Sequence, residues 1–342
     1  MLARFTRPAA ASLRRTLTTA SKPRERVRIV EVGPRDGLQN EKGVIPPSMK
    51  AELINRLTAA GTEIIEAGSF VSPKWVPQMA GTAEVLKMMD RKPDLYYPVL
   101  VPNMKGLELL LDLLAKQPKD EVPLANEVAV FTAATDAFCK ANTNCTIAES
   151  LERLKPVAEK ALDAGLRVRG YVSVVIDCPY SGHVDPAAVK PVTQALFDMG
   201  CYEVSLGDTV GTGNPTTVNE LLHTMLDKTG IPPEKLAGHF HDTYGMAVAN
   251  IFTALDHGLR TFDSSVGGLG GCPYSPGATG NVATEDVLYA LRGTRFDVPG
   301  NLEALAEVGS WISKALNKPN ASRVGKALEA RREREGVMKA KL

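Results

Sequence analysis

The sequence has few cysteines, no long apolar run and almost no net charge. Its 342 residues include only five cysteines, none with zinc-finger or Cys-x-x-Cys spacing: Cys139, Cys145, Cys178, Cys201 and Cys272. A sparse, odd set in a chain this long argues against a disulfide framework and favours a reducing compartment. No apolar stretch approaches the roughly 20 residues that span a bilayer, so we expect no membrane partner.

The net charge of +1 conceals an uneven distribution. The first 24 residues carry six bases and no acid, which leaves 34 bases against 39 acids in the rest. A mildly acidic body gives no sign of a nucleic-acid partner.

The basic opening is also rich in Ser, Thr and Ala, which is typical of a mitochondrial transit peptide, predicted over residues 1–24; a disordered basic arm is the alternative. The last residues, Ala340-Lys341-Leu342, approach a Ser-Lys-Leu peroxisomal signal. We expect the mitochondrial matrix, with the peroxisome as a second destination.

Short runs rich in β-branched residues alternate with helical stretches over most of the chain. Eight strands are predicted, at 27–32, 62–66, 95–101, 127–131, 167–175, 202–206, 236–240 and 261–266. Helices are predicted at 48–60, 79–89, 103–115, 147–164, 245–257 and 282–291, and others begin near 186 and 215. Eight strand–helix units over about 265 residues predict an α/β fold of the (β/α)8 TIM-barrel class.

We expect the catalytic barrel to span 27–300 and additional C-terminal helices with a frayed tail to span 301–342. An open doubly wound sheet is the rival fold. It would carry Gly-x-Gly-x-x-Gly after its first strand, where this chain has Gly33-Pro-Arg-Asp-Gly37.

Polar and reactive residues gather where the predicted strands end. In chain order they are Arg35, Asp36, Glu66, Ser69, Phe70, Asp208, His239, His241, Cys272 and Asn281. Because catalytic groups of such barrels lie at the carboxyl ends of the strands and in the loops that follow, we expect one mouth of the barrel to hold the active site.

His239 and His241 are the strongest local signal. Two residues apart on a strand, their side chains point to the same side and can reach one ion. Asp36 follows the first strand, which adjoins the eighth in a closed barrel, and Asn281 offers a neutral oxygen. This mixed set suits Mg²⁺ or Mn²⁺ and lacks the thiolates of structural zinc. Two histidines satisfied by core hydrogen bonds are the alternative.

Three further residues each allow a catalytic and a structural interpretation. Arg35 is a permanently charged donor suited to an enolate or carboxylate oxygen, or one half of a surface salt bridge. Glu66 would orient Arg35, act as a base, or serve as a buried structural partner, and Asp208 has the same ambiguity.

The segment from Gly267 to Asn281 is rich in glycine, with four glycines in the five residues before Cys272. Glycine reaches backbone conformations that a β-carbon forbids, which suits a loop that bends sharply or moves. The pattern is typical of a lid that carries a reactive group. A surface turn with an incidental cysteine is the alternative.

Together these motifs resemble the 3-hydroxy-3-methylglutaryl-CoA lyase family of metal-dependent barrels. The similarity runs over roughly residues 27 to 315 and is carried by the segments 32–42, 65–79, 205–209, 239–245 and 267–281. By this resemblance the metal ligands are Asp36, His239, His241 and Asn281. By the same resemblance the catalytic residues are Arg35, Glu66, Asp208 and Cys272.

The resemblance implies cleavage of the acyl-CoA substrate (S)-3-hydroxy-3-methylglutaryl-CoA to acetyl-CoA and acetoacetate, as in leucine degradation and ketone-body formation. Arg35 would hold the enolate oxygen, with Ser69 and Phe70 also expected at the substrate. Asp208 or His239 would take the hydroxyl proton. Cys272 would protonate the enolate carbon without forming an acyl intermediate.

The sequence departs from the family pattern at two places. Phe240 stands between the two histidines where cysteine is usual, and Ala67 and Gly68 replace the more common residues after Glu66. The second departure leaves open a lyase for a bulkier 3-hydroxyglutaryl-CoA homologue. A condensing synthase of the isopropylmalate or homocitrate type and a non-catalytic barrel are further alternatives. The expected assembly is a homodimer, although nothing in the sequence specifies it.

Overall fold

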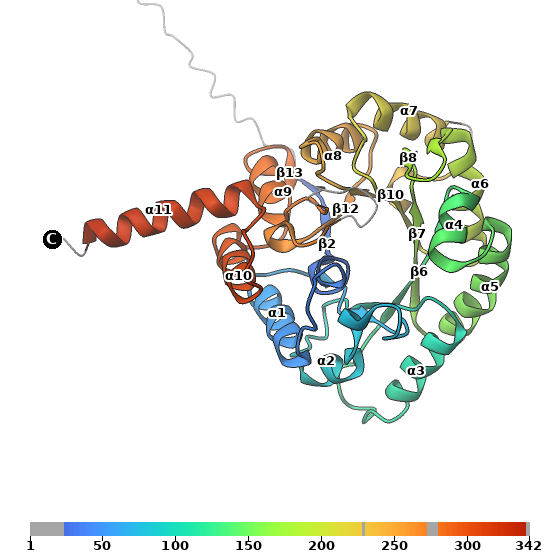
Figure 1. The fold of residues 1–342 in the computed structure, drawn as a ribbon, viewed down its shortest axis with the longest axis horizontal. Coiled ribbons are helices and arrows are strands. Elements are labelled where there is room, and N and C mark those ends of the chain that lie inside the picture. Colours follow the sequence, from blue (N-terminus) through green and yellow to red (C-terminus); the bar gives the residue numbers. More distant parts are fainter. Residues whose placement is uncertain (1–23, 228–229, 272–279, 340–342) are drawn as a thin grey trace, which may run out of the picture.

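Nine short parallel strands form one curled sheet in the computed structural model, which describes residues 24–227, 230–271 and 280–339 (Figure 1). Their order is β3–β2–β12–β11–β10–β7–β6–β5–β4. The two outermost strands, β3 (Ile64–Ile65) and β4 (Gly68–Ser69), follow each other in the chain. Between them, Glu66 N–H donates to Glu31 on β2 and Ala67 N–H donates to Pro98 on β5. The sheet therefore closes on itself, and the predicted barrel is confirmed.

The other barrel strands lie where the sequence predicted them. They are β2 (Arg28–Glu31), β5 (Pro98–Leu100), β6 (Glu127–Ala133), β7 (Arg167–Ser173), β10 (Glu203–Asp208), β11 (Leu236–Phe240) and β12 (Thr261–Ser264). Their parallel register places His239 beside Gly207 on one side and beside Asp263 on the other. The carboxyl ends of these strands consequently meet at one mouth of the barrel.

Helices cover the outside of the sheet (Figure 1), and eight of them follow barrel strands. They are α1 (Pro47–Ala59), α2 (Thr82–Met88), α3 (Met104–Leu114), α5 (Ile147–Asp163), α6 (Pro186–Asp198), α7 (Pro215–Leu226), α8 (Ala247–Asp256) and α9 (Thr284–Leu291). Local sequence marks several of their starts. Thr146 and Glu149 form a reciprocal capping box before α5, and Asn214 caps α7 with Pro215 in its first turn. None of the helices described is both long and apolar enough to cross a membrane.

Several small elements were not predicted. The stretch expected as a long loop after the fourth strand contains helix α4 (Asp136–Thr143), capped by Thr135. A hairpin joins β8 (Asp177–Cys178) to β9 (Gly182–His183), and β1 (Glu25–Arg26) pairs with β13 (Phe296–Asp297). Short helical turns are η1 (Gly33–Gly37), η2 (Pro77–Met79), η3 (Pro233–Lys235) and η4 (Val266–Gly268).

Two C-terminal helices follow the barrel, as predicted: α10 (Leu302–Ala315) and α11 (Arg323–Lys339). Figure 1 shows α11 projecting from the body. The carboxylate of Asp286 on α9 accepts hydrogen bonds from Ser322 Oγ and from the N–H groups of Arg323 and Val324, which fixes the start of α11.

Helix α11 continues to Lys339, so a tail after the helices stays a prediction for the residues beyond it. Ion pairs of the first part of α11 with α10, such as Lys314–Glu329 at 2.6 Å, and the i,i+4 pair Arg331–Glu335 support the helix. The Ala340–Leu342 signal lies outside the described residues. So does the predicted transit peptide, apart from Arg24.

Candidate metal centre and active site

The π-helical turn η1 comes directly after β2 and carries Arg35 and Asp36. Its start is fixed by Gly33 N–H, which donates to Glu31 Oε1 at 2.9 Å. Its end requires a glycine, because a β-carbon on Gly37 would lie 2.8 Å from both Ser265 Oγ and Leu269 Cβ. The turn therefore packs tightly against the chain after β12 and presents two adjacent charged side chains at the barrel mouth.

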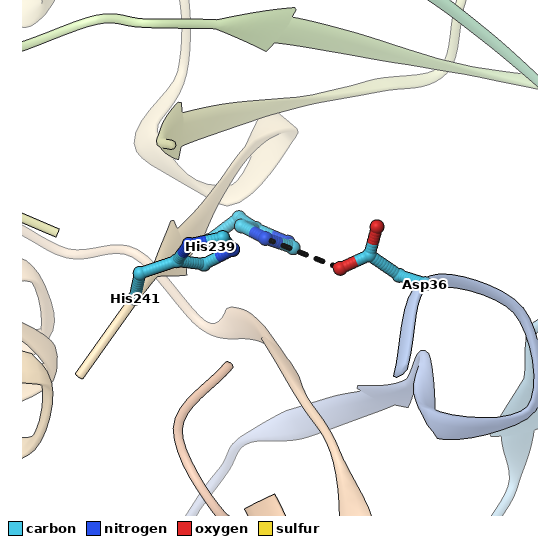
Figure 2. A group of neighbouring side chains, drawn as sticks. All are labelled: Asp36, His239 and His241. Atoms are coloured by element: carbon cyan, nitrogen blue, oxygen red, sulfur yellow. Dashed lines mark ion pairs between the residues drawn. The ribbon is translucent and has the colours of Figure 1, made fainter. Parts of the chain in front are cut away.

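Asp36, His239 and His241 converge there, as the sequence predicted (Figure 2). One potential ligand atom from each lies within 4.8 Å of those of the other two. His239 Nε2 lies 4.0 Å from Asp36 Oδ2, which is too long for a hydrogen bond but suitable for two ligands of one ion. Both histidines are buried. The three side chains are therefore arranged so that one cation could be bound by all of them.

Asn281, the fourth predicted ligand, also reaches this cluster. Its backbone forms a bridge with His241, and its Nδ2 donates to Asp36 Oδ2 at 2.8 Å and to Leu269 O at 3.3 Å. A cation would use the remaining amide oxygen. Sequence reasoning missed Gln39, whose Nε2 donates to Asp36 Oδ1 at 2.5 Å. Its position three residues after Asp36 was the one available signal.

The electrostatics of the cluster fit a hard divalent cation. Burial alone would raise the pKa of Asp36, but Arg35 and the two histidines outweigh it and lower that pKa. Burial and the neighbouring His239 lower the pKa of His241 to about 4. An ionised carboxylate and a neutral imidazole are the forms that bind metal. In addition, His241 Nδ1 is buried without a hydrogen bond of normal geometry in the described part of the chain.

Arg35 is held by two carboxylates. Its Nε and Nη2 lie 2.9 and 2.8 Å from Glu66 Oε2, and its Nη1 donates to Asp36 Oδ1 at 2.9 Å. Tyr171 donates its hydroxyl to the same Glu66 oxygen at 3.4 Å, and its ring lies 5.6 Å from the guanidinium carbon. Burial raises the pKa of Glu66, while Arg35 counteracts the rise. Of the predicted roles for Glu66, this geometry supports the orientation of Arg35.

Asp208 ends β10 at the same mouth but does not join the Arg35–Asp36 cluster. Its two oxygens accept hydrogen bonds from the N–H groups of Gly211 and Gly213, at 3.1 and 2.9 Å. Burial raises its pKa to about 6, and these amides limit the rise. Within the described ranges, no hydrogen bond or ion pair links Asp208 to Arg35, Asp36 or either histidine.

The remaining predicted residues have separate positions. Ser69 is buried at the end of β4, where its Oγ accepts a hydrogen bond from Val71 N–H at 3.1 Å. Phe70 is half-buried and packs against the core. Cys272 lies outside the described residues. The chain on either side of that segment is closely juxtaposed, because a β-carbon on Gly280 would lie 2.5 Å from Gly271 N.

Sequence reasoning also missed a buried polar group below the cluster. Asp263 on β12 accepts a hydrogen bond from His239 Nδ1 at 3.1 Å, and Arg169 on β7 pairs with Asp263 at 2.8 Å. The available signal was the two-residue spacing of charged or polar residues within otherwise apolar strands. That spacing places Arg169 and Tyr171 on one face of β7.

Comparisons with known proteins agree with this architecture. A family model described as HMGL-like matches residues 26–312. The 3-hydroxy-3-isohexenylglutaryl-CoA/hydroxy-methylglutaryl-CoA lyase of Pseudomonas aeruginosa is 52% identical over 307 residues, which cover 90% of this chain and 98% of that protein. The mitochondrial hydroxymethylglutaryl-CoA lyase of Bos taurus is 50% identical over 303 residues, with coverages of 89% and 90%. The crystal structure of hydroxymethylglutaryl-CoA lyase from Pseudomonas aeruginosa is similar with a TM-score of 0.84 at 52% identity, covering 90% of this chain and 99% of that one.

Proposed function

The chain belongs to the HMGL-like family, and from this premise we propose that it is a hydroxymethylglutaryl-CoA lyase. It cleaves (S)-3-hydroxy-3-methylglutaryl-CoA to acetyl-CoA and acetoacetate. The observation that carries the proposal is the convergence of Asp36, His239 and His241 at one end of the barrel, with Arg35 fixed beside them. Relatives of about 50% identity that bear this name support it.

We propose that Asp36, His239, His241 and Asn281 hold a divalent cation, Mg²⁺ or Mn²⁺. When bound, the cation supplies Lewis-acid polarisation of the substrate's hydroxyl and carboxylate oxygens. The protein prepares the site by keeping Asp36 ionised and His241 neutral. Oxygen and imidazole donors without thiolate favour these two ions over a structural zinc.

Arg35 stabilises the leaving group. Cleavage of the C2–C3 bond leaves the electron pair on the acetyl-CoA fragment as an enolate, whose oxygen gains negative charge. A preoriented guanidinium stabilises such charge without reorganising during the reaction. Glu66 and Asp36 supply that orientation through three of the N–H groups of Arg35.

The cleavage requires a base for the C3 hydroxyl proton and an acid for the enolate carbon. Asp208 and His239 are the candidates for the base, and a pKa of about 6 leaves Asp208 mostly ionised at neutral pH. Cys272 is the proposed acid, as the sequence pattern of its loop suggests. Ser69 and Phe70, at the end of β4, are proposed to line the acyl-CoA side of the mouth.

A bulkier 3-hydroxyglutaryl-CoA homologue is a second candidate substrate. The specific support is the name of the Pseudomonas aeruginosa relative, which includes an isohexenyl substrate alongside the methyl one. Comparison of kcat/KM for the two acyl-CoA esters decides between them. A pocket too small for the bulkier acyl group would exclude it sterically. The value of kcat/KM would then be much higher for the methyl ester.

The decisive assay is acetoacetate formation by the full-length chain, with and without a chelator, followed by addition of Mg²⁺ or Mn²⁺. Turnover that disappears with chelator and returns with metal supports the lyase. Thiol release from acetyl-CoA in the presence of a 2-oxo acid, without cleavage of the lyase substrate, would instead identify a condensing synthase.

We further propose that the enzyme is a homodimer of the mitochondrial matrix. The relative from Bos taurus is named as mitochondrial, and the basic opening of this chain supports import. Fluorescent fusions at either end test the two signals, because masking residues 340–342 affects only a peroxisomal destination. Light scattering of the purified chain measures its oligomeric state.

A further inference from the structure

The centre of the barrel, directly below the metal site, is filled by charged and polar side chains. Arg169, Glu203, Ser205 and Asp263 all lie there with 2% or less of their surface exposed. The interiors of such barrels are usually filled by bulky branched apolar residues. Buried charges are costly unless they are paired and hydrogen-bonded. This polar centre therefore calls for a reason beyond packing.

Hydrogen bonds from neighbouring polar side chains hold the carboxylate of Asp263 in place. Arg169 Nη2 donates to Asp263 Oδ1 at 2.8 Å, and Arg169 Nε donates to Glu203 Oε1 at 2.9 Å. Ser205 Oγ donates to Asp263 Oδ2 at 2.7 Å. A carboxylate with these partners has one fixed orientation and remains an acceptor.

The oxygen of Asp263 that accepts from Ser205, Oδ2, also lies against the ring of His239. Asp263 and His239 are register partners on the adjacent strands β12 and β11. Asp263 Oδ2 lies 3.1 Å from His239 Nδ1, while Nε2 of the same ring faces Asp36 Oδ2 at 4.0 Å. Because the acceptor is a carboxylate, Nδ1 must carry hydrogen, which leaves the lone pair of the neutral ring on Nε2.

We propose that Asp263 is a positioning residue that fixes His239 as the Nδ1–H tautomer and aims its Nε2 lone pair at the metal site, with Arg169 holding Asp263 in place. The inference rests on the proposed function only in taking Asp36 and His239 as metal ligands. Such outer partners typically change metal affinity by about 10- to 100-fold when they are removed.

The assignment also decides between the two candidate bases. With Nδ1 donating to Asp263 and Nε2 serving as a ligand, His239 has no nitrogen left to accept the hydroxyl proton. Of the two candidates, only Asp208 can then take that proton.

The tautomer can be measured without any variant of Asp263. The full-length, metal-free protein is labelled with ¹⁵N in its histidine rings, and long-range ¹H–¹⁵N spectra are recorded at a pH where His239 is neutral. His239→Gln assigns the resonances. We expect a protonated Nδ1 and an unprotonated Nε2. A protonated Nε2, or averaging between the two tautomers, would overturn the proposal.

A second measurement uses Mn²⁺ binding, followed by calorimetry. Asp263→Asn should weaken Mn²⁺ affinity about 10- to 100-fold. The matched control is Asp286→Asn, another buried aspartate, whose hydrogen bonds go to the start of α11; its affinity should equal that of the wild type.

Wild-type Mn²⁺ affinity in a folded Asp263→Asn protein would contradict the proposal. If that variant does not fold, the wild-type tautomer decides the question. Neither readout requires turnover, so failure of the lyase assay leaves both results interpretable and concerns the proposed function alone.

Discussion

At the residue scale, the side chain of Arg35 is fixed by contacts on several sides. Its guanidinium is buried, contacts two carboxylates and lies against the ring of Tyr171. A planar group with several donors can satisfy both carboxylates at once, whereas a lysine ammonium cannot reproduce that geometry. The orientation of Arg35 thus depends on Glu66, which has no predicted contact with the metal.

We predict that Glu66→Gln lowers kcat by on the order of 10²-fold, because a neutral amide no longer holds Arg35 toward the developing enolate. Mn²⁺ affinity, measured by calorimetry, should change little, since Asp36 and the histidines remain. Glu127→Gln is the control, because Glu127 is also buried but pairs with Arg167 and Tyr202. Equal losses of kcat in the two variants would show that burial, and not contact with Arg35, explains the effect.

Asp208 should determine the acid side of the pH profile. A base is active when ionised, so with a pKa of about 6 the value of kcat/KM should fall as the pH drops below 6. In Asp208→Asn that dependence should disappear and activity should drop, while the amide oxygen can still accept from Gly211 or Gly213. Rate measurements between pH 5 and 8 at saturating metal provide the test. A profile unchanged in shape would remove Asp208 as the base.

At the scale of elements, the turn η1 determines where the site forms. It is only five residues long, yet it carries both Arg35 and Asp36. Its position depends on close contact with Ser265 and Leu269, far away in the sequence. Side chains at Gly33 and Gly37 would open that contact.

Gly37→Ala should therefore weaken Mn²⁺ binding and lower kcat, each by about 10-fold or more, since small displacements of reacting groups are costly. The added β-carbon would meet Ser265 Oγ and Leu269 Cβ at 2.8 Å. Gly43→Ala is the matched control in the same loop, because its β-carbon would meet nothing within 4 Å. Circular dichroism confirms that both variants are folded. Comparable behaviour of the two would mean that η1 tolerates displacement.

The sequence was sufficient to predict elements whose signal is local. The eight predicted barrel strands followed from β-branched runs, whereas the short strand β4 was not predicted. The pairing of His239 and His241 followed from the two-residue period of a strand. The structure of η1 could not be predicted, because distant residues of the β12–α9 connection shape it. Helix α4 was missed because its buried residues are the adjacent pair Phe138 and Cys139, and two adjacent residues show no helical period. The roles of Arg169 and Asp263 depend on which strands face each other across the barrel, which sequence order alone does not specify.

At the scale of the whole molecule, buried carboxylates join the first strand of the barrel to its last strand–helix unit. Glu31 accepts hydrogen bonds from the N–H groups of Gly33 and Val266 and from Thr284 Oγ1. Glu285 accepts the N–H of Gly267 with both oxygens. Burial raises the pKa of Glu31 to about 7 and that of Glu285 to about 8. The folded protein consequently retains protons that the unfolded chain releases.

This difference predicts that stability falls as pH rises. A carboxyl whose pKa is raised in the folded state makes its full contribution to folding stability below its unfolded pKa of about 4.5. That contribution is lost progressively as the pH rises to the folded pKa. Between pH 6.5 and 8.5, Glu285 alone should lower the free energy of unfolding by on the order of 2 kcal/mol. Urea unfolding of the metal-free protein across this range should show the fall, and Glu285→Gln should reduce it by that amount. Glu303→Gln, at an exposed position on α10, is the control. An identical slope in Glu285→Gln and wild type would contradict the assignment.

The ion pairs at the centre of the barrel also constrain how the protein can evolve. Arg169 contacts Glu203 and Asp263 together, at 2.9 and 2.8 Å, with no exposure to solvent. Loss of any one of the three breaks at least one buried ion pair, and breaking a buried pair typically costs about 3–5 kcal/mol. Single substitutions at these positions are therefore destabilising and should not accumulate by neutral drift. Among homologues the three residues should therefore occur together. A homologue that lacks one of them should lack all three, and it should orient the residue equivalent to His239 with a different partner.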